Sequence, residues 1–158
     1  MNSIRIRVGA IIPKGKEFLF VKLIKDGNVF WLLPGGGLEF GETLAEGVIR
    51  ELKEETNLDI KPYDIVYIRD RLGNNQHDLD IFFLAEITGG KLELGDDPDQ
   101  TEHILDAAKW IPVDELDKLS FFPEDVIPLL REISSGNTVD AIHLATCDCS
   151  ARRKLTRA

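Results

Sequence analysis

The stretch GGGLEFGETLAEGVIRELKEETNL, residues 35–58, joins a glycine-rich turn to a strongly acidic helix. Thr43 followed three residues later by Glu46 is a capping box, which predicts that a helix begins here. Asn57 is suited to the left-handed backbone conformation that ends a helix. We therefore expect a helix over residues 43–56, with a capping residue at each end.

This helix has an apolar face beside an acidic face. At about 100° per residue, the residues predicted to be buried are Ala45, Val48, Ile49 and Leu52. Glu51, Glu54 and Glu55 follow the spacing i, i+3, i+4, which places their carboxylates on one patch. A solvated acidic face would explain this spacing. A site for a hard divalent cation would also explain it, since Mg²⁺ and Mn²⁺ prefer carboxylate oxygens.

A run of glycines precedes the helix by a few residues. Pro34 is followed by Gly35, Gly36 and Gly37, and such a loop can bend sharply and bring a backbone carbonyl to a metal ion. By itself the loop would be ordinary turn chemistry. Together with the capped helix and the clustered carboxylates, it favours the cation site.

These residues resemble the Nudix box, G-x5-E-x7-R-E-U-x-E-E-x-G-U, in which U is a bulky aliphatic residue. Gly36 and Glu42 occupy the first two fixed positions, and residues 50–56 (RELKEET) match the core of the motif. Leu58 matches the last aliphatic position. Asn57 stands where the motif has glycine, but asparagine is the next-best residue for a left-handed helix end, so we expect the geometry to be kept.

The resemblance implies a fold and a set of metal ligands. The fold would be α/β, a Nudix-type α/β/α sandwich with a mixed β-sheet, over residues 1–133, with residues 134–158 as a C-terminal tail of undefined structure. The family's metal ligands fall on the carbonyl of Gly36 and the carboxylates of Glu51, Glu54 and Glu55. Arg50 resembles the arginine that orients these carboxylates.

The family's general base varies between members, and the resemblance leaves two alternatives here. One is the box glutamate Glu51. The other is an acid on a later loop, for which Glu102 is the first candidate, with Asp97 and Asp99 behind it. The residues implied in catalysis are thus Arg50, Glu51, Glu54 and Glu102.

Hydrophobic alternation predicts the rest of the fold. The predicted strands cover residues 4–12, 17–24, 29–33, 64–71, 78–87 and 107–111, and a second helix covers 124–133. Residues 89–100 are rich in glycine and aspartate and are predicted to form a loop. This arrangement indicates a mixed sheet covered on both faces.

Length and charge narrow the function classes. The chain has 158 residues, which suits one domain, and no apolar run reaches the roughly 20 residues that span a bilayer. We expect a cytoplasmic protein with no membrane partner, in which Cys147 and Cys149 are free thiols. The net charge of −9 argues against a nucleic-acid partner and requires divalent cations to offset repulsion from a phosphate compound.

The resemblance implies a Mg²⁺-dependent hydrolase, with Mn²⁺ as a second metal, that cleaves a nucleoside diphosphate linked to X. ADP-ribose or a related ADP-linked compound is the expected small-molecule substrate. The alternatives are a nucleotide-sensing module without catalysis, or a pyrophosphohydrolase of nucleoside triphosphates or RNA ends, which the acidic charge disfavours. Dimers are common in the family, and the sequence leaves both a monomer and a homodimer open.

Two further sets of side chains are candidates for substrate contacts. Basic residues on predicted strands could contact phosphate, although solvated charge is their commoner role; they are Arg5, Arg7, Lys22, Arg69 and Arg71. Trp31, Phe40 and Phe83 could stack on a base, although core packing is the default for aromatic residues.

Overall fold

The structure is a computed structural model that describes residues 3–73, 75–95 and 104–147. The strands are β1 (Ser3–Ile11), β2 (Pro13–Lys14), β3 (Glu17–Lys25), β4 (Asn28–Leu32), β5 (Gly35–Gly37), β6 (Leu58–Leu72), β7 (Gln76–Gly90), β8 (Ile104–Pro112), β9 (Phe121–Phe122) and β10 (Ile142–Cys147). The helices are α1 (Leu44–Thr56) and α2 (Ile127–Ser134), with short 3-10 helices η1 (Val113–Lys118) and η2 (Glu124–Val126).

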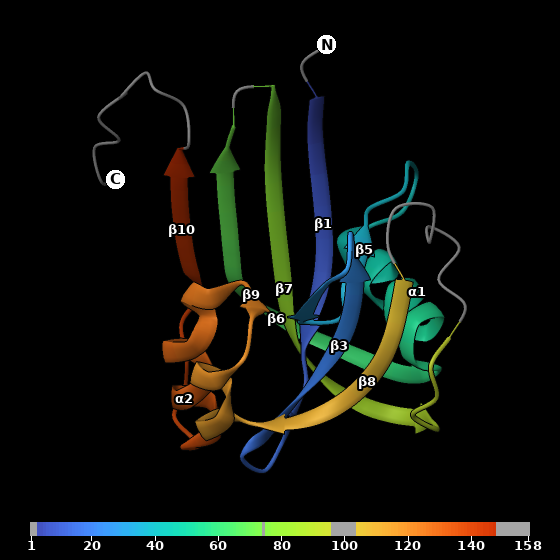
Figure 1. The fold of residues 1–158 in the computed structure, drawn as a ribbon, viewed down its shortest axis with the longest axis vertical. Coiled ribbons are helices and arrows are strands. Elements are labelled where there is room, and N and C mark those ends of the chain that lie inside the picture. Colours follow the sequence, from blue (N-terminus) through green and yellow to red (C-terminus); the bar gives the residue numbers. More distant parts are fainter. Residues whose placement is uncertain (1–2, 74, 96–103, 148–158) are drawn as a thin grey trace.

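The strands form two sheets (Figure 1). The first has the order β10-β6-β7-β1-β5, in which β1 pairs parallel with β7 and antiparallel with β5. The second has the order β2-β3-β4-β9, and β8 pairs with β3. The predicted α/β fold with a mixed sheet is confirmed.

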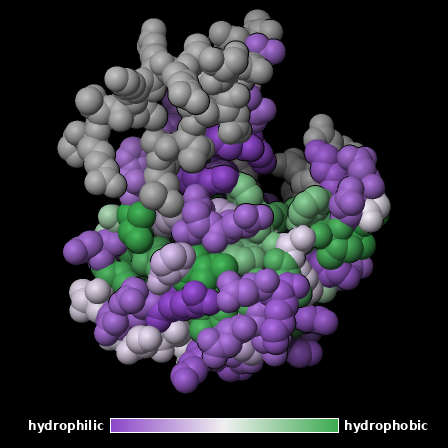
Figure 2. Space-filling model, turned by 60° about the vertical axis from the view of Figure 1, so that its left-hand side comes forward, coloured by the Kyte–Doolittle hydropathy of each residue, from purple (hydrophilic) through white to green (hydrophobic). Residues whose placement is uncertain are grey.

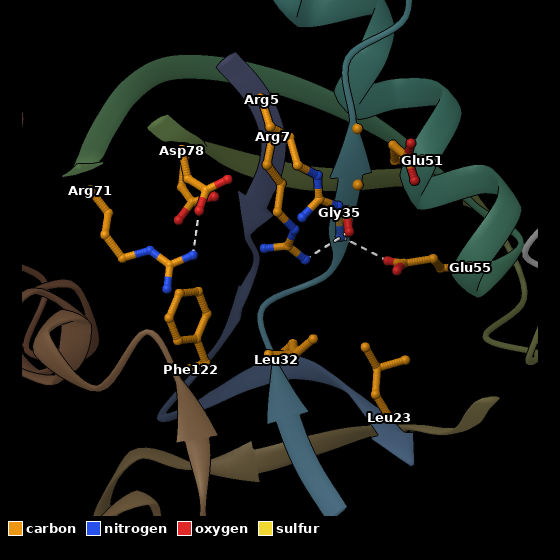
Figure 3. A pocket seen from close by; sticks show the side chains of 13 residues that line it. Arg5, Arg7, Leu23, Leu32, Gly35, Glu51, Glu55, Arg71, Asp78 and Phe122 are labelled. Carbon is orange, nitrogen blue, oxygen red and sulfur yellow. Dashed lines mark hydrogen bonds and ion pairs between the residues drawn. The ribbon is translucent and has the colours of Figure 1, made fainter. Parts of the chain in front are cut away.

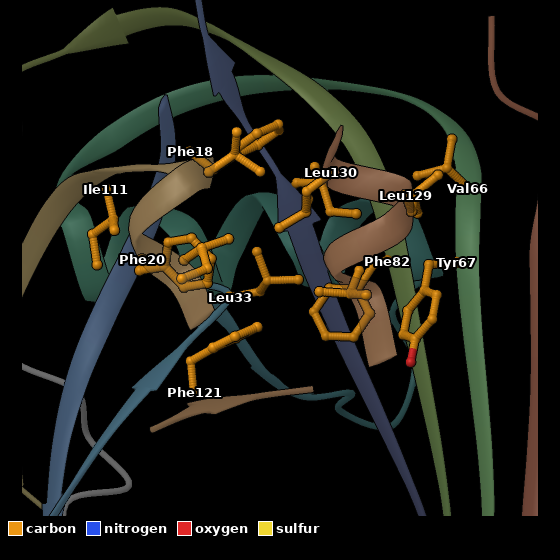
Figure 4. Close-up of a cluster of buried hydrophobic side chains, with 14 residues drawn as sticks. Phe18, Phe20, Leu33, Val66, Tyr67, Phe82, Ile111, Phe121, Leu129 and Leu130 are labelled. Carbon is orange, nitrogen blue, oxygen red and sulfur yellow. The ribbon is translucent and has the colours of Figure 1, made fainter. Parts of the chain in front are cut away.

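Side chains on the two faces of the first sheet enter different cores, because successive residues of a strand point to opposite faces. Val8 and Ala10 of β1 pack in a cluster with Val48 and Leu52 of α1. Ile11 of β1 lies in the other cluster, between the sheets, which α2 closes. Figure 4 shows this second core, where aromatic rings from both sheets meet.

Several elements differ from the strands predicted above, among them β5, β6 and β10. The glycines of β5 pair with β1, with Gly36 opposite Val8, rather than forming only a turn. β6 begins at Leu58, immediately after α1, although its register with β7 shifts near Pro62 and Ile65 and breaks the alternation there. β10 lies in the segment 134–158 and extends the first sheet by pairing parallel with β6.

Apolar side chains outside the two cores are scattered over the surface. On the face shown in Figure 2, hydrophobic patches lie between hydrophilic side chains. No helix in the described part of the chain is long and apolar enough to cross a bilayer. Cys149 lies outside the described residues.

Candidate metal and phosphate site

Both ends of α1 are fixed by local hydrogen bonds. The Thr43 hydroxyl accepts from the Glu46 backbone N–H at 3.2 Å, and the Glu46 carboxylate accepts from the Thr43 N–H at 2.8 Å. Asn57 has φ 57°, in the left-handed region, and its N–H donates to the Lys53 carbonyl at 3.0 Å. The predicted capping box and the left-handed asparagine are confirmed.

The buried face of α1 carries two of the three clustered glutamates. It consists of Gly47, Val48, Glu51, Leu52, Glu55 and Thr56. Glu51 and Glu55 are 7% and 5% exposed, whereas the Glu54 side chain is 31% exposed. The prediction that Ile49 is buried is wrong, because the helix turns the 48/51/52/55 face to the sheet and leaves Ile49 41% exposed.

The glycines of β5 let these carboxylates approach the backbone. The Gly35 N–H donates to Glu55 Oε2 at 2.8 Å. A Cβ on Gly36 would lie 2.2 Å from Glu51 Oε2, closer than any side chain allows. Gly35 has φ +145°, and its Cβ would lie 2.2 Å from the Val8 carbonyl oxygen. Position 35 therefore requires glycine because of the backbone, whereas a side chain at position 36 would displace the Glu51 carboxylate.

Arg50 connects the loop to the acids of the helix. Its Nη2 and Nε donate to the two Glu42 carboxylate oxygens at 2.6 and 3.1 Å, and Nη2 also donates to the Gly37 carbonyl at 2.9 Å. Its Nη1 donates to Glu51 at 2.8 Å and to Glu54 at 3.3 Å. The hydrogen bonds from Arg50 lower the pKa of Glu42, and Glu42 in turn raises the pKa of Arg50.

These residues fit a hard divalent cation in donor type, since they offer carboxylate oxygens and a backbone carbonyl. The glycine at position 36 also keeps a Cβ away from Glu51. The carboxylates do not converge, however: within residues 3–73, 75–95 and 104–147, no three His, Cys, Asp or Glu side chains form a metal-holding group. Glu54 would have to turn away from Arg50 Nη1 to join Glu51 at one ion.

Glu51 and Glu55 line a cavity of about 220 Å³. Figure 3 shows its parts: the acids and the glycine strand on one side, arginines and aspartates on another, and apolar side chains below. The lining residues besides the glycines are Arg5, Arg7, Leu23, Leu32, Glu51, Glu55, Arg71, Asp78, Asp80 and Phe122. The cavity therefore places buried carboxylates opposite arginines.

Three of the five basic residues considered for phosphate contacts line this cavity: Arg5, Arg7 and Arg71. Lys22 instead pairs with Asp106 at 2.7 Å on a partly exposed surface. The guanidinium of Arg69 lies 4.3 Å from the centre of the Phe122 ring.

None of the three aromatic candidates lines the cavity. Trp31 and Phe83 pack with the cores, and Phe40 is fully exposed. Phe122 takes the place beside the site. Sequence reasoning missed it because β9 is only two residues long and carries no alternation signal. Glu102, Asp97 and Asp99 lie outside the described residues.

Comparison with known proteins identifies the family. A model of the NUDIX domain matches residues 3–131. The chain belongs to the NUDIX family. The predicted enzyme class, a Nudix hydrolase of phosphoanhydride bonds, is confirmed.

Similar proteins occur in several different organisms. It is 35% identical to an ADP-ribose pyrophosphatase of Methanocaldococcus jannaschii, over 77% of this chain and 70% of that protein. It is 38% identical to Nudix hydrolase 6 of Arabidopsis thaliana, over 72% of this chain but only 41% of the relative. The solved structure of a NUDIX hydrolase from Nitrosomonas europaea has a TM-score of 0.70 at 22% identity, covering 87% of this chain and 93% of that one.

Proposed function

We propose that this Nudix protein is a Mg²⁺-dependent pyrophosphohydrolase of a nucleoside diphosphate linked to X, with ADP-ribose as the first candidate substrate. The observation that carries the proposal is the cavity in which the buried acids Glu51 and Glu55, beside the glycine strand, face a set of arginines. Acids suit divalent cations and arginines suit phosphoryl oxygens. One cavity thus offers both kinds of partner that a diphosphate needs.

The size of the cavity supports a diphosphate as the group bound there. At about 220 Å³ it is smaller than the roughly 300–1,000 Å³ of sites that enclose a drug-sized ligand. We infer that the nucleoside lies outside the cavity. ADP-ribose is chosen because the M. jannaschii relative is named for that substrate.

We infer that the carboxylates of Glu51, Glu54 and Glu55 and the carbonyl of Gly36 would hold the metal. Bound Mg²⁺ would supply charge stabilisation at the diphosphate oxygens and a lowered pKa of bound water. Arg50 is a positioning residue, because its hydrogen bonds to Glu42 and to the Gly37 carbonyl hold its guanidinium beside Glu51.

The reaction requires a group that accepts a proton from the attacking water. We propose Glu51 or Glu102 for this role. The position of the Glu51 carboxylate in the cavity lining supports the first. Water adds to one phosphorus as the bridging P–O bond breaks, which gives a nucleoside monophosphate and phosphorylated X.

A substrate panel tests this proposal. The protein is incubated with Mg²⁺ and, separately, with ADP-ribose, sugar nucleotides, dinucleoside polyphosphates and nucleoside triphosphates, and the products are separated by chromatography. We expect AMP and ribose 5-phosphate from ADP-ribose. Absence of turnover of every compound with Mg²⁺ and with Mn²⁺ would leave the nucleotide-sensing module as the better account.

We also propose that the protein is a cytoplasmic homodimer. Light scattering of the purified protein tests the dimer, for which a mass near 35 kDa is expected from the chain mass of 17.7 kDa. A monomeric mass at micromolar concentration would contradict it.

A further inference from the structure

Arginines and aspartates alternate across three neighbouring strands of the first sheet. Arg5 and Arg7 of β1 lie opposite Asp78 and Asp80 of β7, respectively. On the other side of β7, Arg71 and Arg69 of β6 lie opposite the same two aspartates. We call these six residues the arginine grid. Its two rows share one face because side chains two apart in a strand point the same way.

The arginine grid carries an excess of positive charge in an acidic protein. Four arginines surround two aspartates, whereas the whole chain has a net charge of −9. The aspartates are 7% and 5% exposed. Asp78 is engaged by Arg71 and by Gln76, whose Nε2 donates at 2.6 Å. Asp125 approaches Arg69 Nε at 3.7 Å from outside the grid.

Several guanidinium N–H groups of the grid are buried without an acceptor among the described residues. They are Arg7 Nη1, Arg69 Nε, Arg69 Nη1 and Arg71 Nε. A buried charged donor without an acceptor is unfavourable. Within the described residues, these are all the buried side-chain N and O atoms that lack a partner. Two of these atoms, Arg7 Nη1 and Arg71 Nε, belong to residues that line the cavity, which favours an anion beside them.

Arg7 is held so that it can serve such an anion. It is 8% exposed, and its Nη2 donates to the carbonyls of Leu33 and Gly35 at 3.1 and 2.7 Å. Its guanidinium also lies 5.7 Å from the centre of the Phe82 ring. Figure 3 shows Arg5, Arg7 and Arg71 on the side of the cavity away from Glu51 and Glu55. Arg7 is therefore a fixed cation in the cavity lining, and its Nη1 has no acceptor among the described residues.

We propose that the arginine grid is a phosphoryl subsite, in which Arg7, flanked by Arg5 and Arg71, binds a phosphoryl group of the substrate without help from metal. The inference rests on the proposed function for the identity of the substrate. The carboxylates of α1 hold the diphosphate only through a cation, whereas the grid binds its anion directly. The subsite therefore retains affinity for a phosphate monoester when divalent ions are removed.

The test is equilibrium binding in EDTA, measured by calorimetry, with AMP, ribose 5-phosphate, inorganic phosphate and adenosine as separate ligands. AMP and ribose 5-phosphate distinguish the two halves of the substrate. We expect binding of at least one phosphorylated ligand, weaker binding at higher salt, and no binding of adenosine. Arg5→Gln and Arg71→Gln should each weaken the bound ligand about tenfold, the loss of one charge-assisted contact.

Two further variants test whether the effect is specific to the cavity. Lys22→Gln removes a cation of β3 that faces Asp106 rather than the cavity, and should change the dissociation constant less than twofold. Arg7→Lys keeps the charge but loses the guanidinium whose Nη2 donates to the Leu33 and Gly35 carbonyls. It should weaken binding more than Lys22→Gln, provided that circular dichroism shows a folded protein.

The outcomes separate this inference from the proposed function. Absence of phosphate-ligand binding to the wild-type protein, adenosine binding as tight as that of AMP, or unchanged binding in Arg5→Gln and Arg71→Gln would each overturn the subsite. Metal-free binding that depends on the arginines, in a protein that hydrolyses no compound of the panel, would instead support the subsite and reject the hydrolase.

Discussion

Arg50 and Glu42 form a bidentate ion pair, in which Nη2 and Nε of the arginine lie 2.6 and 3.1 Å from the two carboxylate oxygens. The two residues lie eight positions apart, one in the loop before α1 and one inside the helix. The remaining guanidinium nitrogen contacts both Glu51 and Glu54. The hydrogen bonds of Arg50 thereby link the loop, helix α1 and the acidic site.

The Arg50→Lys variant tests whether these hydrogen bonds matter to the reaction. Lysine keeps the positive charge but cannot form the two parallel hydrogen bonds. Since partners that orient metal ligands are typically worth about 10–100-fold in activity, we expect kcat to fall in that range while the circular dichroism spectrum stays unchanged. A wild-type kcat in the folded Arg50→Lys protein would show that the hydrogen bonds of Arg50 do not position the residues needed for the reaction.

Gly36→Ala and Gly35→Ala form a matched pair. A methyl group at Gly36 collides with the flexible Glu51 side chain. One at Gly35 collides with the Val8 carbonyl, at a φ of +145° that alanine rarely adopts. Gly36→Ala should therefore lower activity at least tenfold with little loss of stability. Gly35→Ala should cost about 2 kcal/mol or more of unfolding free energy. Equal losses of stability in urea unfolding of the two variants would contradict this separation.

Asn57 tests the departure from the motif. Its φ of 57° disfavours a side chain that cannot bond locally, so Asn57→Ala should destabilise the protein by about 1 kcal/mol. Asn57→Gly, which restores the family's residue, should be neutral or slightly stabilising. Thermal unfolding of both variants measures the effect, and an alanine variant as stable as the glycine variant would rule out this role of the left-handed backbone.

The buried Asp80 gives a pH dependence with a definite sign. Burial raises the pKa of Asp80 above its ordinary value of 3.8, while Arg7 and Arg69 act in the opposite direction. The folded protein thus binds this proton more readily than the unfolded chain, so the contribution of Asp80 to stability falls as pH rises from 3.8 through the raised pKa.

Asparagine at position 80 does not titrate, so the Asp80→Asn variant does not lose stability in this way as pH rises. The unfolding free energy of the variant relative to wild type should therefore increase over the same pH window, and urea unfolding at a series of pH values measures it. A relative stability of Asp80→Asn that stays level or decreases with pH is incompatible with the raised pKa.

The capped helix could be predicted from sequence because its determinants are local. Thr43, Glu46 and Asn57 act within one turn of the helix ends, and the motif spacing ties Glu51 and Glu55 to Gly36. The buried face was misjudged at Ile49 because the rotation of a helix against its sheet is set by tertiary packing. The exposed residue is apolar, and the buried residues include two acids.

The arginine grid could not be predicted in the same way. Arg5, Arg71 and Asp78 meet only through the pairing of β1, β6 and β7, and the register shifts in β6 hide its alternation. β10 escaped prediction for a similar reason, because its partner β6 is some 70 residues earlier in the chain. Long-range register, rather than local pattern, decides these features.

The dependence of hydrolysis on Glu51 and on a divalent cation is measured by the initial rate of nucleoside monophosphate release from the best substrate of the panel, with Mg²⁺ and with EDTA. Wild type, Glu51→Gln and the surface control Glu115→Gln are compared. We expect that EDTA abolishes the rate, that Glu51→Gln lowers it about 10²–10⁴-fold, and that Glu115→Gln stays within about twofold of wild type. A folded Glu51→Gln protein that works at the wild-type rate would contradict this expectation.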